Sequence, residues 1–424
     1  MTGPTSSRRY GVIGLLILLF VITYLDRVCI SVAGPRIQAD LNISPAGWGW
    51  VTGVFTISYC LFEIPTGVLG DRIGPRRVLT RIVLWWSAFT ALTGAVASYV
   101  PLLITRFLFG AGEAGAFPNA AIVLARWFTP ARRATMAGVL LAASQVGGAV
   151  APLLVVPIQI RYGWRMSFYI FGITGVVWAT TWYSWFRDRP REMTQSGRSE
   201  AHTDSVRAGV QPPPFPWRSV FHSPSTLALL LTAFCYVYVY NFFQTWFHTF
   251  LVKGRGFGEA GLWLSALPYV VAAGANLAGG AASDLLVRRL GLTSGRRALG
   301  AAALAVSGCC AIGAMLAHQA IVVIVLLAIV YGGITLQQSA VFGVCLDIGR
   351  NYAGAVVGLM NTSAQIGGLL GSVAYGYIVQ RSGSYDAPFV PMAALLFVGA
   401  ASWLKVDASR ELVATRQPNT QTAR

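Results

Sequence analysis

Two charged side chains lie inside one apolar stretch of the chain, RFLFGAGEAGAFPN. Arg106 carries a planar guanidinium that can hold a carboxylate through two hydrogen bonds, and Glu113 can take up and release a proton. Gly110, Gly112 and Gly115 also match the dinucleotide fingerprint G-x-G-x-x-G, which works only at the turn from a strand into a helix. Because the apolar run continues on both sides, we interpret these glycines as sites of close helix packing.

A second charged pair, Asp26 and Arg27, interrupts the first apolar stretch. A helix rises about 1.5 Å per residue, which places Asp26 about 24 Å above the inner edge of its ascending span and Arg106 about 22 Å above the inner edge of a descending span. We therefore expect Asp26, Arg27 and Arg106 to face one another across a cavity between the first and fourth helices. Glu113 lies two turns beyond Arg106 on the same helix face, about 10 Å nearer the cytoplasm.

These charges need a compensating role, because an ionised side chain at mid-bilayer costs at least about 2.5–3.5 kcal/mol. We predict that Arg27 and Arg106 bind an anionic substrate. Asp26 and Glu113 are candidates for proton coupling, since carboxylates can lose their charge and could load and release protons at different stages. The alternative is that these charges have only a structural role, with Asp26 and Arg27 pairing at the outer membrane interface, at the end of a short first helix.

Uncharged polar side chains within the apolar runs complete the candidate pocket. Each could donate a hydrogen bond to a substrate hydroxyl or join two helices. The candidates are Tyr24, Tyr59, Gln145, Tyr236, Tyr240, Asn241, Gln244, Asn361 and Gln365.

The elements that must position these residues follow from composition. Of 424 residues, 55% are hydrophobic and 11% are charged, which is too few charges to cover a soluble domain. Apolar runs of about 18 residues or more, each able to cross a membrane as a helix, recur along the chain. They span roughly 11–33, 48–70, 78–98, 101–125, 134–158, 165–186, 225–250, 260–284, 297–317, 319–346, 352–378 and 386–404. The fold class is therefore an all-α polytopic membrane protein with twelve transmembrane helices.

The net charge of +17 is an orientation signal. With the N-terminus inside, most of the 32 Lys and Arg residues fall in inner loops and tails, so both termini are predicted to be cytoplasmic. No nucleic-acid partner is expected. The six cysteines lie within apolar segments without metal-ligand spacing, so neither a metal nor another cofactor is implied.

A polar, proline-bearing segment divides the chain into two halves. We predict a six-helix bundle over 1–186, a cytoplasmic linker over 187–223, a second bundle over 224–404 and a cytoplasmic tail over 405–424. The hexapeptide ASQVGG of the fifth span has a counterpart, SAQIGG, in the eleventh, which indicates duplication and pseudo-symmetry. Shifting the charged residues by this repeat lands on uncharged ones, so the N-terminal half is expected to carry the chemistry.

The segment GVLGDRIGPRRVL after the second span resembles the signature loop of the major facilitator superfamily. Further stretches, TYLDR, RFLFGAGEAGAFPNA, SQVGGAVAP and GWRMSFYIFG, resemble its anion:cation symporter family, which carries sugar acids and other organic anions with protons. The resemblance implies two bundles around a cavity that opens alternately to each side. It also implies proton sites at Asp26 and Glu113, substrate binding at Arg106, and ligand contacts at Tyr59, Gln145 and Asn361.

The signature loop is expected to gate the cytoplasmic side through salt bridges and helix-end contacts. The gating candidates are Gly67, Asp71, Arg72, Arg76 and Arg77. The chain departs from the family at His248, where many relatives have proline, which leaves the specific substrate open.

We therefore predict proton-coupled import of a small organic anion, such as a hexuronate, aldonate or aldarate, across a bacterial inner membrane. The expected partners are this anion, protons and the lipid bilayer, and the protein is expected to be monomeric. The alternatives are an exporter or antiporter of the same fold and a non-transporting receptor. An enzyme is not expected, because the sequence holds neither H-E-x-x-H nor G-x-S-x-G.

Overall fold

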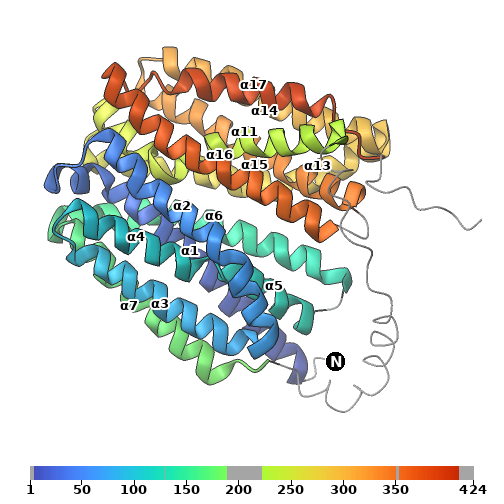
Figure 1. Cartoon of the computed structure of the whole chain (residues 1–424), viewed down its shortest axis with the longest axis horizontal. Coiled ribbons are helices and arrows are strands. Elements are labelled where there is room, and N and C mark those ends of the chain that lie inside the picture. Colours follow the sequence, from blue (N-terminus) through green and yellow to red (C-terminus); the bar gives the residue numbers. More distant parts are fainter. Residues whose placement is uncertain (1–3, 129, 189–221, 350–352, 410–424) are drawn as a thin grey trace, which may run out of the picture.

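The chain folds into two bundles of helices that lie side by side (Figure 1). The computed structural model describes residues 4–128, 130–188, 222–349 and 353–409. The N-terminal bundle contains α1 (Pro4–Asp40), α2 (Pro45–Ile73), α3 (Pro75–Ala95), α4 (Tyr99–Glu113), α5 (Ala116–Trp127), α6 (Pro130–Tyr162) and α7 (Trp164–Trp185).

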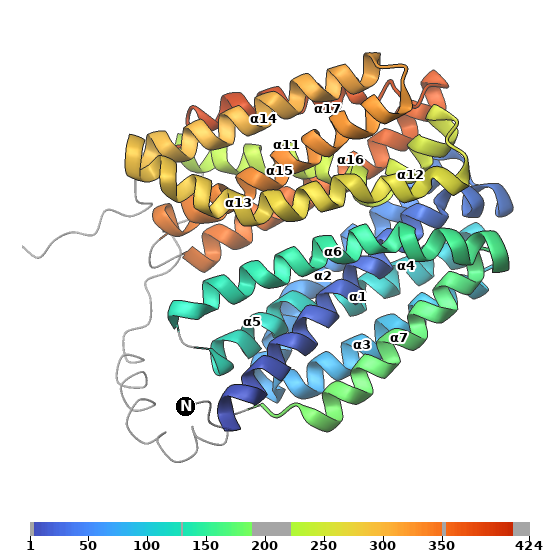
Figure 2. The same cartoon turned by 180° about the vertical axis from the view of Figure 1, so that it is seen from behind.

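The C-terminal bundle repeats this arrangement (Figure 2). It contains α11 (Pro224–Thr245), the short α12 (Phe247–Thr249), a π-helical turn (Phe250–Gly254), a 3-10 helix (Glu259–Ala266), α13 (Leu267–Leu290), α14 (Leu292–Leu316), α15 (Ala320–Gly349), α16 (Ala353–Ser382) and α17 (Phe389–Trp403). These elements coincide with the predicted spans, with α4 and α5 together forming the fourth, so the predicted fold class is confirmed.

The helices have the length and composition of membrane spans. Within the described residues, nine helical segments are long and apolar enough to cross a membrane, and α17 is a shorter apolar helix. The remaining long helices pack against them: α7 against α3 and α16 against α11. The chain is an integral membrane protein. The predicted linker over 187–223 and the predicted tail over 405–424 lie largely outside the described residues.

The fourth span is interrupted directly after Glu113. The α-helix gives way to a turn at Ala114 and Gly115 before α5 resumes. Pro118 explains the interruption, because it lacks the N–H that would bond to the carbonyl of Ala114. Glu113 is therefore the last residue of α4, at a break in the middle of the bundle.

The predicted duplication is visible in the packing of one glycine in each bundle. A Cβ atom at Gly147 of α6 would collide with the backbone of Val21 on α1, and a Cβ at Gly367 of α16 would collide with the backbone of Phe234 on α11. The ASQVGG and SAQIGG hexapeptides therefore make the same helix contact twice. Both contacts require glycine because backbone meets backbone.

The two bundles are joined toward one end of the molecule. We call the end that carries residues 40–45 and 246–258 the far end, and the end where α1 begins and α17 ends the terminal end, on the right in Figure 1. Thr52 Oγ1 of α2 lies 2.6 Å from Ser372 Oγ of α16, and the backbone N–H of Ala46 donates to Gln380 Oε1 at 3.1 Å. Among described residues, the hydrogen bonds between bundles lie at mid-depth or toward the far end, so this conformation is closed at the far end.

Candidate functional site

A cavity of about 80 Å³ lies between the two bundles. It is bounded by α1, α2 and α4 on one side and by α11 and α16 on the other. Its lining residues are Arg27, Thr52, Phe55, Thr56, Tyr59, Arg106, Val237, Tyr240, Asn241, Gln244, Thr245, Gln365 and Gly368. The cavity is smaller than the roughly 300–1,000 Å³ of ordinary small-molecule sites, so a sugar-sized ligand requires the bundles to separate further.

Arg106 lines this cavity as a buried cation without a partner. Its side chain is 3% exposed, and it makes neither a hydrogen bond nor an ion pair within the described residues. The guanidinium carbon lies 4.5 Å from the ring centre of Phe109 and 5.3 Å from that of Phe55. Gly110 holds α2 and Phe55 this close, because a Cβ there would lie 2.7 Å from the carbonyl oxygen of Phe55. Aromatic faces compensate only part of a buried charge, so Arg106 is poised to accept an anion.

Arg27 also lines the cavity, but it already has an anionic partner. Its Nε donates a hydrogen bond to Glu113 Oε1 across the gap between α1 and α4. Aromatic rings surround the guanidinium, whose carbon lies 4.7 Å from the ring centre of Tyr59 and 5.3 Å from that of Tyr24. Glu113 is 1% exposed, and its Oε2 has no hydrogen-bond partner within the described residues.

Asp26 lies behind the cavity wall, which differs from the expectation that it faces the cavity beside both arginines. The side chain is 2% exposed, and neither carboxylate oxygen has a hydrogen-bond partner within the described residues. Glu113 and Arg106 are the charged groups that act on it electrostatically. The helical register explains the difference, because adjacent residues point about 100° apart and Arg27 takes the cavity side of α1.

Two hydrogen-bonded pairs of side chains close the cavity between the bundles. The hydroxyls of Tyr24 and Tyr240 lie 3.1 Å apart. Tyr331 receives a hydrogen bond from Gln244 Nε2 at 2.8 Å and donates one to Gln145 Oε1 at 3.2 Å. Tyr24 and Gln145 therefore connect the two bundles beside the cavity in this conformation and do not line the cavity itself.

The eleventh span contributes unevenly. Gln365 lines the cavity, whereas Asn361, one turn away, is half-buried and does not line it. Asn241 of α11 lines the cavity and donates to the carbonyl of Gly368 at 2.5 Å. Tyr236 is buried outside the cavity.

Sequence reasoning missed the contribution of α2. Thr52, Phe55 and Thr56 line the cavity together with Tyr59. Thr52, Thr56 and Tyr59 are spaced i, i+4 and i+7, which places them on one helix face. That spacing of polar groups in an apolar span was the available signal.

The proposed gating residues lie at the terminal end, where the described residues make no hydrogen bond between the two bundles in this conformation. Gly67 packs on Pro118 of α5, where a Cβ would meet the proline Cβ at 3.2 Å. Arg76 binds within its own bundle, its backbone N–H donating to Asp188 Oδ1 at 2.9 Å and its Nε to the carbonyl of Tyr183 at 3.0 Å. Arg72 and Arg77 are exposed. Asp71 belongs to α2, but its side chain lies outside the described part of the structure.

His248 joins three elements at the far end. Its Nδ1 lies 3.0 Å from Ser31 Oγ of α1, and its Nε2 lies 2.9 Å from Ser265 Oγ of the 3-10 helix before α13. The imidazole is fully buried. His248 at this position therefore adds one hydrogen bond between the bundles, to Ser31, and one within the C-terminal bundle, to Ser265.

Comparison with known proteins places these features in a family. The protein-family model described as Major Facilitator Superfamily matches residues 16–372 of this chain. A probable sulfoacetate transporter from Cupriavidus necator is 32% identical over 407 residues, covering 94% of each chain. A hexuronate transporter from Bacillus subtilis is 29% identical with 91% coverage of each chain, and a probable L-galactonate transporter from Escherichia coli is 31% identical over 67% of this chain and 64% of its own.

Solved structures share the fold. The chain is similar to a bacterial homologue of the human lysosomal transporter Spinster, in an inward-facing and occupied conformation, with a TM-score of 0.75 and 21% identity. The match covers 93% of this chain and 96% of that one. The unoccupied inward-facing structure of that homologue matches with a TM-score of 0.71.

Proposed function

Since this chain belongs to the major facilitator superfamily, a family of transporters, we propose that it imports a small organic anion together with protons by alternating access. The observation that carries the proposal is the Arg106 guanidinium, which is buried at the cavity and makes neither a hydrogen bond nor a close ion pair with any described residue. An anionic substrate would supply that partner through charge-assisted hydrogen bonds.

The cavity lining suits a hydroxylated carboxylate. Around the arginines stand hydroxyl and amide groups from both bundles, among them Thr56, Tyr59, Gln244 and Gln365. These groups can exchange hydrogen bonds with substrate hydroxyls, while the guanidinium holds the carboxylate. The names of the related transporters include hexuronate, L-galactonate and galactarate/D-glucarate, all hydroxylated acids. We therefore infer a sugar acid or a similar organic anion as the substrate class.

The pairing of Arg27 with Glu113 suggests how protons are coupled to the substrate. The single positive charge of Arg27 cannot fully neutralise both the Glu113 carboxylate and a substrate carboxylate at the same time. Protonation of Glu113 removes the competing charge and frees the guanidinium for substrate, and a bound anion in turn favours protonation of Glu113. Asp26, buried beside Arg106, is the second candidate to carry a proton.

The closed far end supports alternating access. Substrate would reach the arginines from the terminal end in this conformation and from the far end in the opposite one. The contacts of His248 and of Thr52 with the opposite bundle must then break in each cycle.

Uptake into proteoliposomes tests the proposal. The purified full chain is reconstituted and offered labelled hexuronate, galactonate, galactarate and sulfoacetate with an acidic exterior. We expect accumulation of at least one acid, and its loss when a protonophore removes the pH gradient. Uptake that ignores the gradient would contradict proton coupling, and binding without uptake would indicate a receptor.

A variant separates coupling from binding. Glu113→Gln mimics the protonated carboxyl, so we expect it to exchange labelled for unlabelled substrate while failing to accumulate it. Asp284→Asn, at an exposed position on α13 away from the cavity, is the matched control and should accumulate substrate as the wild type does. Normal accumulation by Glu113→Gln would remove Glu113 from the coupling mechanism.

An exporter or antiporter of the same fold is the main alternative. A carrier of cationic cargo would place cation-attracting groups in the cavity, whereas this cavity presents two arginines. Substrate counterflow in both directions, compared at equal gradients, would show whether import is the favoured direction.

A further inference from the structure

A second hollow lies within the C-terminal bundle, apart from the cavity that holds the arginines. It has a volume of about 610 Å³ and is enclosed by α13, α14 and α15, which lie together in Figure 2. Its walls are entirely apolar side chains and glycines, including Val271, Leu286, Ala302, Val306, Ile329 and Gly332. This volume falls in the range of about 300–1,000 Å³ found for small-molecule sites.

Small residues create this hollow. Ala302 stands where a larger side chain would fill the space between the helices, and Gly332 allows α15 to pack closely on Val271 of α13. At Gly332 even a Cβ atom would approach Val271 Cγ1 to 2.8 Å. An apolar hollow of this size costs stability when nothing packs against its walls, and apolar material is what it accepts.

The hollow is an open groove on the side of the bundle. Val271, Val306 and Ile329 line it and remain exposed. In a membrane protein this lateral surface faces hydrocarbon. The segment from Val271 to Leu286 rises about 22 Å along α13, which exceeds one leaflet of a hydrocarbon core about 30 Å thick. A lipid chain can therefore lie along the groove.

Two unpaired arginines stand at its terminal end. Arg288 and Arg289 follow Leu286 by one turn or less at the end of α13, and both are exposed without a hydrogen bond or ion pair in the described residues. The neighbouring Arg296 and Arg297 are already engaged, with Asp347 Oδ2 at 2.8 Å and the carbonyl of Val406 at 2.5 Å. Because Arg288 and Arg289 lie in the last turn of the membrane-spanning α13, we place their guanidinium groups at the level of the lipid headgroups, where they can bind a phosphate.

We propose that this groove binds an anionic phospholipid, with an acyl chain between α13, α14 and α15 and the phosphate at Arg288 and Arg289. The groove supplies shape for the chain, and the two cations select the headgroup. Because α13 also packs on α6 of the other bundle, where Tyr269 meets Gly148, the lipid rests on a helix that contacts both halves of the transporter.

Native mass spectrometry of the purified full chain tests this proposal, with phosphatidylglycerol and phosphatidylcholine of identical chains titrated in parallel. We expect phosphatidylglycerol to bind at least roughly tenfold more tightly, since each arginine near the headgroup contributes about 1 kcal/mol. Equal affinity for the two lipids would overturn the headgroup assignment.

Two sets of variants locate the site. Ala302→Phe and the milder Ala302→Leu should fill the groove and remove the tight phosphatidylglycerol adduct, whereas Ala88→Phe, at an exposed position on α3, should keep it. Replacing Arg288 and Arg289 by Gln should bring phosphatidylglycerol down to the affinity of phosphatidylcholine, whereas Arg81→Gln, an exposed arginine on α3, should not.

Folding is checked by the melting temperature and by the elution of each variant as a single species. Well-folded groove-filling variants that bind phosphatidylglycerol as tightly as the wild type would overturn the proposal. A change in oligomeric state on groove filling, with lipid binding unchanged, would assign the groove to a second copy of the chain instead.

Discussion

The two bundles share a fold but differ in the charged side chains that they bury. The N-terminal bundle buries Asp26, Arg106 and Glu113, whereas the repeat relates these positions to uncharged regions of the C-terminal bundle, around Tyr240, Val323 and Val330. Glycine contacts that shape the helix pairs are kept in both halves. Packing thus constrains both copies of a duplicated bundle alike, while these buried charges are present in one copy only, which is expected if they serve the proposed transport.

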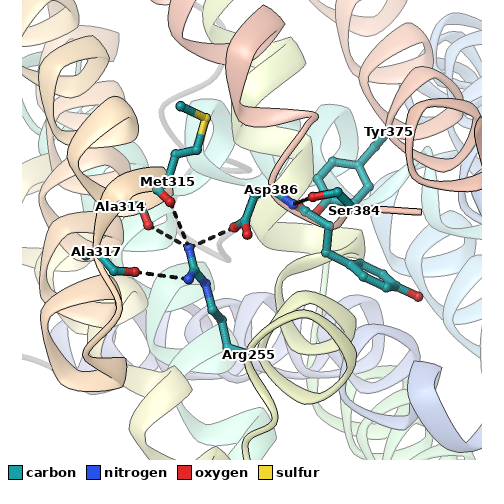
Figure 3. A network of polar contacts seen from close by, with 8 residues as sticks. Arg255, Ala314, Met315, Ala317, Tyr375, Ser384 and Asp386 are labelled. Carbon is teal, nitrogen blue, oxygen red and sulfur yellow. Dashed lines mark hydrogen bonds and ion pairs between the residues drawn. The ribbon is translucent and has the colours of Figure 1, made fainter. Parts of the chain in front are cut away.

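One arginine from each bundle shows the same contrast: Arg106 is buried and Arg255 is half-buried. Arg255 joins elements of the C-terminal bundle to one another near the far end, donating to the carbonyls of Ala314 at 2.9 Å and Ala317 at 3.0 Å and to Asp386 Oδ1 at 2.7 Å (Figure 3). It caps the C-terminal end of α14, where a cation is favourable. Arg106 has no such partners in the described residues. Arg255 is thus hydrogen-bonded into the fold, whereas Arg106 is not, which fits the ligand-binding role proposed for Arg106.

The largest effect is expected for Arg106→Gln. Loss of the charge should lower substrate affinity roughly 10- to 100-fold in calorimetric titrations, because a hydrogen bond to a charged group contributes about 1.5–3 kcal/mol. Unchanged affinity would mean that the substrate does not bind at Arg106.

Arg255→Gln should show the opposite pattern. We expect it to destabilise the protein by about 2 kcal/mol, because several charge-assisted hydrogen bonds are lost and Asp386 loses its partner. Its substrate affinity should stay within about twofold of the wild type. Melting curves and titrations on both arginine variants, measured side by side, check the contrast; an affinity loss in Arg255→Gln without destabilisation would erase it.

The glycines test where the halves are equivalent. Gly147→Ala and Gly367→Ala should each cost about 1–3 kcal/mol, because the added Cβ meets backbone in both bundles. Gly138→Ala on α6 and Gly358→Ala on α16 have no neighbour within 4 Å of the added Cβ, so they should be neutral or stabilising. Thermal unfolding of the four variants measures this. Sensitivity in only one bundle would show that the halves are not packed alike.

The smallest effect is expected at the uncharged wall of the cavity. Gln365→Ala should weaken substrate binding about fivefold, because one neutral hydrogen bond of about 1 kcal/mol is lost. Asn361→Ala, one turn away, should change affinity less, because Asn361 does not line the cavity in this conformation. Titration with a hydroxylated acid and with an analogue lacking the hydroxyl compares the two; a larger loss at Asn361 would mean that the cavity widens toward it.

Much of the fold was predictable because the bilayer imposes helix lengths. The observed helices begin and end within a few residues of most predicted spans, and the depth argument correctly placed Arg27 and Arg106 at one cavity. The i and i+7 relation also put Arg106 and Glu113 on the same helix, since the break caused by Pro118 follows Glu113.

The partners of the charged groups were not predictable. The sequence analysis placed Asp26 beside both arginines and Glu113 deeper in the membrane, whereas in the structure the ion-pair partner of Arg27 is Glu113. The bracing roles of Tyr24 and Gln145 likewise depend on Tyr240 and Tyr331, which lie in the other bundle. Such contacts between residues far apart in the chain are set by how the bundles meet, and periodicity carries no information on that.

By itself, the sequence determined that this chain spans a membrane as a duplicated set of helices and that charge is concentrated in the membrane-embedded part of its first half. Both follow from local physics, because each span must satisfy its own backbone and each buried charge must have compensation. Only the tertiary structure decided which arginine forms an ion pair with Glu113 and at which end the bundles close. Those outcomes depend on side chains meeting across helices, where rotations of a few tens of degrees change every partner.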